Sequence, residues 1–114
     1  MDDKLTDALN FSNYMITLDN QKRLLKEQYN NDIIYYYNGG QFTLTHALIS
    51  FCALIAITGN SESVLIDDNS TPIRIDDLPA FSNNILAAYT KAGNTYLTGF
   101  TKLKNNRTVK GIIS

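Results

Sequence analysis

The chain opens with a long stretch in which apolar residues recur every three or four positions. Between Asp3 and Asn30 there is neither Gly nor Pro. This spacing is typical of one face of an α-helix, and we predict a helix over 3–30. The main apolar face contains Ala8, Phe11, Met15, Leu18, Leu25 and Tyr29, and a second stripe contains Leu5, Leu9, Ile16 and Leu24.

Two β-prone segments follow, separated by Asn38-Gly39-Gly40. Residues that tolerate positive φ between two such segments are the strongest local signal of a hairpin, which we predict from Ile33 to Leu44. Thr43 or Thr45 can then cap a second helix. Its interior, residues 47–57, has Ser50 as its one polar member, and we expect it to be buried because it is apolar nearly all round.

The chain from Val64 to Ile75 predicts a second hairpin, with turn chemistry at residues 68–70 and Pro72 on an edge strand. Asp76 or Asp77 should cap a third helix that carries Pro79 in its first turn. Gly93 and Asn94 could break this helix, whose basic end suits a helix C-terminus. Its apolar spacing follows Ile85, Tyr89, Ala92, Tyr96, Gly99 and Leu103.

The predicted order is therefore helix, hairpin, buried helix, hairpin, long helix, an α+β fold in which the outer helices pack antiparallel over the central one. A chain of 114 residues fits one domain with a modest core. We expect a single domain over 1–114, comprising an N-terminal helix (3–30), a hairpin-helix-hairpin-helix core (33–104) and a basic tail (105–114).

Composition narrows the functional classes. Lys and Arg total 10 against 11 for Asp and Glu, so no overall field attracts nucleic acid or anionic lipid. The start is acidic and lacks the features of a signal peptide, and the apolar run at 47–57 is about half the roughly 20 residues that span a bilayer. We expect a soluble protein with no membrane partner.

The residues that could carry chemistry have structural explanations. Asp67-x-Asn69-x-Thr71 superficially resembles the start of a calcium loop, but Pro72 occupies the position that needs Gly, and Leu78 the position that needs Glu. Turns and helix caps explain these carboxylates better, although weak cation binding or a catalytic pair stays open.

Histidine and cysteine give no clear catalytic pair either. His46 and the sole cysteine, Cys52, are six positions apart, which does not place them on one helix face. Asn38-Gly39-Gly40 lacks the lysine and the spacing of a nucleotide-binding loop. We therefore expect no catalytic residue, no metal and no cofactor.

The first predicted hairpin, which carries Tyr35, Tyr36, Tyr37 and Phe42, is the preferred contact surface. Alternation along a strand sends Tyr36 to the face opposite Tyr35 and Tyr37, so at least one tyrosine should be exposed. Exposed tyrosine could stack single-stranded bases, but with net charge near zero we favour a protein partner. The expected interaction residues are Tyr35, Tyr37, Phe42, Phe11, Met15, Leu18, Tyr89 and Tyr96.

Four motifs occur in order from Tyr37. They are Tyr37-Asn38-Gly39-Gly40-x-Phe42, a helix with Leu48, Ile49 and Ile55, Ile66-Asp67-Asp68-Asn69-Ser70 before an apolar strand, and Asp77-Leu78 opening a helix that ends near Leu103-Lys104. In this order they resemble a small domain of unknown function in phage tail and tail-fibre-associated proteins. The whole chain is also similar in size and composition to small proteins of T4-like marine phages.

The resemblance implies a virion-associated or tail-assembly role, with the protein in a virion or the host cytoplasm. It transfers no functional residue. The sequence thus favours a non-enzymatic phage structural or tail-assembly protein that acts through protein contacts. We expect a homo-oligomer, since broad apolar helices usually mark interaction sites. The alternative is a small phage regulatory protein that binds a host or phage factor or single-stranded nucleic acid.

Overall fold

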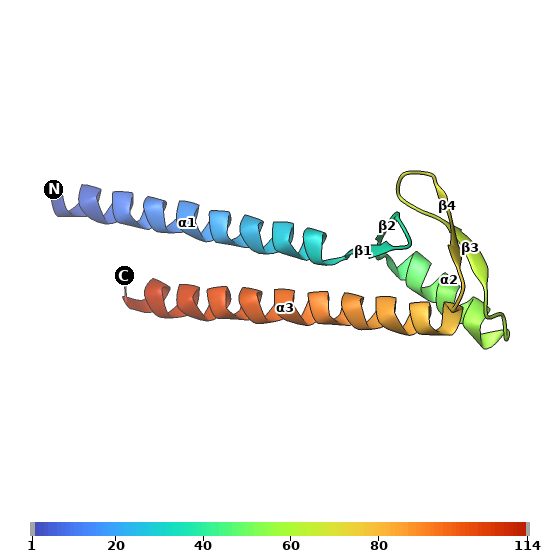
Figure 1. Ribbon diagram of the computed structural model, residues 1–114. Helices are drawn as coiled ribbons and strands as arrows, with labels where there is room; N and C mark the ends of the chain where they lie inside the picture. The colour runs from blue at the N-terminus through green and yellow to red at the C-terminus, as the bar shows by residue number, and fades with distance from the viewer. Residues whose placement is uncertain (1, 114) are drawn as a thin grey trace. The chain divides into compact units, whose positions relative to one another are not determined.

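The computed structural model describes the backbone of residues 2–113 and the side chains of residues 3–105. It contains three helices and two antiparallel hairpins, so the α+β fold and the element order are confirmed (Figure 1). The elements are α1 (Asp2–Asp32), β1 (Ile34–Tyr37), β2 (Gly40–Thr43), α2 (His46–Ile57), β3 (Ser63–Ile66), β4 (Pro72–Ile75) and α3 (Leu78–Ile113).

Contacts divide the chain into two compact units. The helical unit comprises Met1–Tyr29 and Asn94–Ser114, and the hairpin unit comprises Asn30–Gly93. Helix α3 contributes its first part to the hairpin unit and its second part to the helical unit.

The first hairpin forms as the Asn-Gly signal predicts. Tyr37 pairs with Gly40, so Asn38 and Gly39 make a two-residue loop. Both have positive φ, 49° and 81°. Positive φ at both central residues defines the turn whose twist matches that of the flanking strands. The sequence therefore sets both the loop and the register of β1 against β2.

Phe81, at the start of α3, is the centre of the hairpin unit's core. Its ring makes edge contacts with Tyr35, Tyr37 and Phe42, at centroid distances of 5.8, 5.2 and 5.7 Å. Edge-to-face contacts between aromatic rings add stability beyond what the rings gain from the burial of their apolar surface. The buried cluster consists of Phe42, Leu44, Cys52, Leu65, Ile73, Ile75, Leu78, Phe81 and Ile85.

The prediction that the central helix is buried is wrong for one side of it. Thr45 caps α2 as expected, its hydroxyl accepting the N–H of Leu48 at 3.1 Å. However, Cys52 is the one buried residue of the helix. A helix is buried on every side only when other elements pack against every side of it. In the hairpin unit, other elements pack against one face of α2, so the opposite face is exposed.

Helix α3 is longer than predicted. Asp77 caps its start, accepting the N–H of Ala80 at 3.1 Å. Gly93 and Asn94 do not interrupt it, and it continues to Ile113, so residues 105–113 of the predicted tail are helical. One interior glycine costs about 1 kcal/mol, which is too little by itself to end a helix of this length. The side chains of Arg107 and Lys110 lie outside the described residues.

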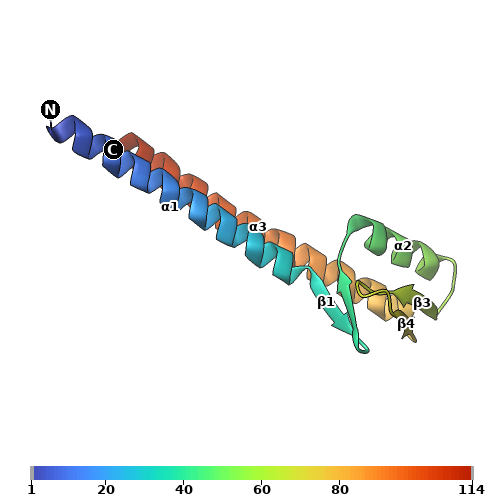
Figure 2. The same cartoon turned by 90° about the horizontal axis from the view of Figure 1, so that it is seen from above.

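In the helical unit, α1 and the second part of α3 lie side by side and run antiparallel (Figures 1 and 2). Tyr29 and Tyr96 pack at 5.1 Å between ring centroids, and Lys26 lies over both rings. Leu18 is buried between the helices, at 3% exposure. None of the described helical residues forms an apolar run long enough to cross a membrane.

Gly93 and Gly99, both in α3, allow a matched stability test. A methyl group at Gly99 would lie 2.6 Å from Cδ2 of Leu25, whereas one at Gly93 would meet no atom within 4 Å. Gly93→Ala should therefore raise the free energy of unfolding by about 0.5–1 kcal/mol. Gly99→Ala should gain less or lose stability, because Leu25 must move. Urea unfolding measures both, and an equal gain would contradict this packing.

Phe81→Ala should lower the free energy of unfolding by about 3–5 kcal/mol, because it leaves a cavity among three aromatic rings. Phe51→Ala is the matched control, since Phe51 is 50% exposed on α2. The control should cost about 1 kcal/mol or less. Similar losses in urea unfolding would show that Phe81 is not the centre of the core.

Candidate interaction surface

Asp67, directly after β3, organises the turn that joins the second hairpin to the first. Its carboxylate accepts the backbone N–H of Gln41 at 3.0 Å, of Asn69 at 3.0 Å and of Thr71 at 2.8 Å. Hydrogen bonds to the charged form favour it. The Gln41 amide, followed by that of Thr71, accordingly lowers the pKa of Asp67.

Asp68 continues the same connection. Its carboxylate accepts the N–H of Thr43 at 3.1 Å and the Thr43 hydroxyl at 2.6 Å, and its own N–H donates to the Gln41 carbonyl at 2.8 Å. Together the two aspartates occupy the outer edge of β2. The interpretation of Asp67 and Asp68 as turn residues is confirmed, with a long-range contact that the sequence did not reveal.

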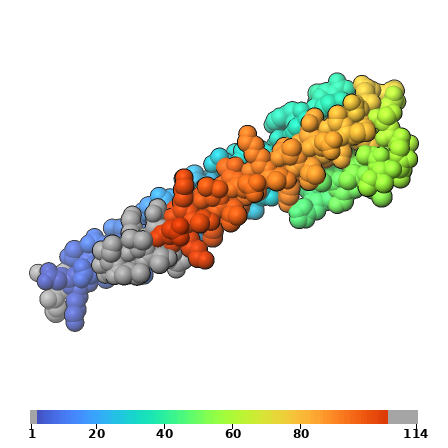
Figure 3. Space-filling view, turned by 90° about the horizontal axis from the view of Figure 1, so that it is seen from below, coloured from blue at the N-terminus to red at the C-terminus, as the bar shows by residue number. Residues whose placement is uncertain are grey.

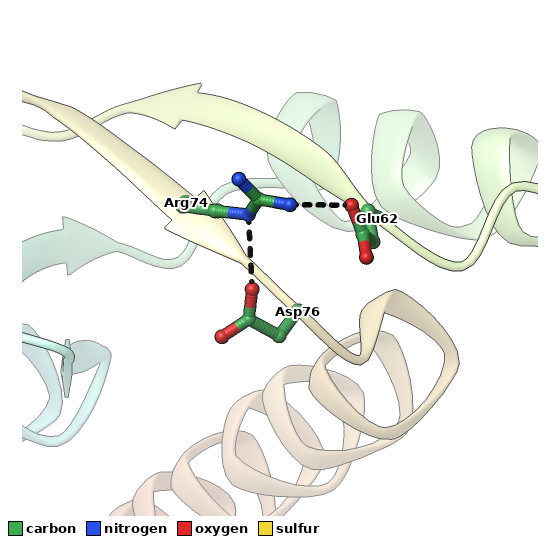
Figure 4. A network of polar contacts seen from close by, with 3 residues as sticks. All are labelled: Glu62, Arg74 and Asp76. Atoms are coloured by element: carbon green, nitrogen blue, oxygen red, sulfur yellow. Dashed lines mark hydrogen bonds and ion pairs between the residues drawn. The ribbon is translucent and has the colours of Figure 1, made fainter.

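Arg74, on β4, holds the two ends of the second hairpin. Figure 4 shows its guanidinium between Glu62, which precedes β3, and Asp76, which follows β4. The distances are 2.8 Å to Glu62 and 3.1 Å to Asp76, and both carboxylates raise the pKa of Arg74. All three side chains are more than half exposed, so the network contributes little to stability. Its effect is to place an ion-paired arginine on the exposed side of β4.

Cys52 and His46, the side chains that could act in catalysis or bind a metal, both contact other residues of the hairpin unit. Cys52 is fully buried, and burial raises the pKa of its thiol. His46 Nε2 lies 2.6 Å from the Tyr89 hydroxyl, with the two rings edge to face. Within the described part of the chain, no group of three His, Cys, Asp or Glu residues could hold a metal ion.

The aromatic residues expected to make contacts lie mostly against the fold. Phe42 is 1% exposed and belongs to the core, so its side chain is not on the surface. Tyr35 and Tyr37 are half-buried against Phe81. Tyr36 is 72% exposed. Tyr36 thus lies on the face opposite Tyr35 and Tyr37, as alternation along the strand predicts, but the two tyrosines chosen as contact residues are the half-buried ones.

The other expected contact residues belong to both units. In the hairpin unit, Tyr89 is half-buried beside His46. In the helical unit, Leu18 is buried, Met15 and Tyr96 are half-buried, and Phe11 is 60% exposed.

A groove between the two helices of the helical unit was not predicted. Its volume is about 300 Å³, and leucine side chains of both helices contribute to its mostly apolar wall. Its lining residues are Gln21, Leu24, Leu25, Gln28, Gly99, Lys102 and Leu103.

In the hairpin unit, one face of α2 is an exposed apolar surface, which we call the α2 face. It carries Phe51, Leu54 and Ile57, which are 50%, 62% and 82% exposed. These residues follow one another at three-residue spacing, so they share one side of the helix. In Figure 3, α2 and the segment after it, in green and yellow-green, form part of the surface.

Sequence reasoning missed the α2 face because the helix is apolar on every side. Periodicity identifies an outward face only when polar residues mark it. Ser50 and Ala47, which are small and exposed, were the only available signal.

The pKa shift of Asp67 predicts how stability depends on pH. A lowered folded-state pKa means that the carboxylate stabilises the fold above the unfolded pKa, about 3.9. This stability is lost as pH falls through the folded-state pKa. Asp67→Asn should therefore lower the urea midpoint at pH 7, and the difference from wild type should shrink toward pH 2. A difference that is constant with pH would contradict this role.

Comparison with known proteins assigns the chain to no family. No protein-family model matches it, and neither the curated proteins nor the solved structures include a significant match.

Proposed function

We propose that this protein is non-enzymatic and acts through protein–protein contacts as a structural or assembly component. The sequence resemblance makes a phage virion or tail the specific assembly that we propose. The observation that carries the proposal is the α2 face, an exposed apolar side of a helix in the hairpin unit.

The α2 face is costly to leave in water. Burial of apolar surface contributes roughly 25 cal/mol per Å², and the three side chains at Phe51, Leu54 and Ile57 are at least half exposed. Covering them with a partner would remove this cost. Exposed apolar residues that are contiguous usually mark an interaction site.

The chemistry of the α2 face favours a protein partner. From Ala47 to Ser61 the sequence contains no charged residue. Nucleic acids bind largely through contacts of Lys and Arg with phosphate, which this segment does not offer. Tyr35 and Tyr37, the residues considered for base stacking, already pack on Phe81. An apolar protein surface is therefore the partner that matches the α2 face.

The test is incorporation into particles of the phage that carries the chain in its genome. Quantitative mass spectrometry of purified particles should detect the wild-type chain at a constant copy number. Leu54→Asp should reduce that amount at least tenfold, because a charge on the α2 face opposes burial.

Leu86→Asp is the matched control, since Leu86 is also an exposed leucine, at 50% against 62% for Leu54, but lies on α3. It should be incorporated as wild type, and circular dichroism should show both variants folded. Absence of the wild-type chain from the particles would refute the structural role. Unchanged incorporation of Leu54→Asp would refute the α2 face as the contact.

A further inference from the structure

Strand β3 has an outer edge whose direction follows from its register. Leu65 lies opposite Ile73 and Ser63 opposite Ile75. The bond from the Asp67 N–H to the Thr71 carbonyl continues this ladder. Because bonded and non-bonded pairs alternate in an antiparallel ladder, Leu65 and Ser63 exchange bonds with β4. The N–H and C=O groups of Val64 and Ile66 therefore point away from β4.

This outer edge of β3, defined by Val64 and Ile66, is open. No hydrogen bond joins the backbone of either residue to another described residue outside its own hairpin. Their side chains are 60% and 63% exposed, and they share one face of the strand. An open, uncharged edge with exposed β-branched side chains is a template for another strand.

The outer edges of β2 and β4 are protected against pairing with another strand. The aspartate turn occupies the outer edge of β2. On β4, Pro72 has no N–H to offer, and Arg74 carries the ion pairs with Glu62 and Asp76. Proline and charge are the usual protections of an edge strand.

Strand β1 differs from β3 in its side chains. Its outward residues by the same alternation are Ile34 and Tyr36. Ile34 is half-buried, so only Tyr36 is exposed beside that edge. Strand β3 alone among the four therefore combines an open edge with two exposed apolar side chains.

We propose that β3 pairs edge to edge with β3 of a second copy of this chain. The two strands run antiparallel about a two-fold axis at Leu65, which places Val64 of each copy opposite Ile66 of the other. Both residues have outward N–H and C=O groups, so each opposite pair exchanges two hydrogen bonds. The two hairpins thereby form one continuous sheet.

A second copy fits this edge because the edge is complementary to itself. An isologous interface presents the same patch from both subunits, and Val64 and Ile66 become cross-strand apolar neighbours on one face. The carboxylates beside the strand are already bound elsewhere in the hairpin unit. Asp67 and Asp68 bind the backbone of β2, and Glu62 binds Arg74.

Amide hydrogen exchange measured by NMR on the full chain tests this pairing directly. The amides of Val64 and Ile66 should become protected as protein concentration rises, because only strand pairing covers them. The Leu65 amide, bonded within the hairpin, should be protected at every concentration and serves as the internal control. Sedimentation velocity should show a monomer–dimer equilibrium over the same range.

The variant Val64→Lys with Ile66→Lys should weaken dimer formation at least tenfold, because both copies then present two ammonium groups at the shared edge. Protection of Leu65 would show that the hairpin persists. Tyr36→Lys is the matched control, since it adds a lysine at the exposed outward position of β1, and it should dimerise as wild type.

Two results would overturn the proposal. One is a monomer with unprotected Val64 and Ile66 amides at all concentrations. The other is a dimer that persists in the lysine variant, which would place the contact elsewhere. This edge shares no residue with the α2 face, so Leu54→Asp should leave the dimer intact whether or not the proposed function holds.

Discussion

The hairpin unit depends on one carboxylate that binds three backbone amides. Asp67 is 7% exposed and reaches from the end of β3 to Gln41 in β2, across 26 positions of sequence. A buried charge must be hydrogen-bonded to be tolerated, and the turn amides of Asn69 and Thr71 complete that requirement. The two hairpins, neither of which would be stable as an isolated pair of strands, are thereby connected by polar contacts as well as by the core around Phe81.

The charged side chains in and around the second hairpin bind other parts of the hairpin unit. Asp67 and Asp68 bind backbone, Asp77 caps a helix, and Glu62 and Asp76 flank Arg74. The same contacts protect the outer edges of β2 and β4. The hairpin unit also exposes two apolar surfaces, the α2 face and the outer edge of β3. The two surfaces would have different roles, one docking on a separate protein and the other joining two copies.

The helical unit follows a different physical principle. Its two long helices meet along a seam in which Gly99 allows Leu25 to approach and Tyr29 stacks against Tyr96. Leu5, Leu9, Ile16 and Leu24, the second apolar stripe of α1, are each more than half exposed. Two helices can bury only the surfaces that face each other, so the stripe stays exposed, although Leu24 also lines the groove between the helices.

The sequence by itself determined the elements that depend on local chemistry. These are the Asn38-Gly39 turn, the caps at Thr45 and Asp77, and the placement of Tyr36 on the strand face opposite Tyr35 and Tyr37. They follow from backbone preferences and the two-residue period of a strand. Only the tertiary structure decided which apolar side of α2 is buried, whether α3 passes through Gly93, and where Asp67 and Asp68 bind. These outcomes depend on contacts between residues far apart in sequence, and an apolar helix or a turn aspartate carries no local mark of its distant partner.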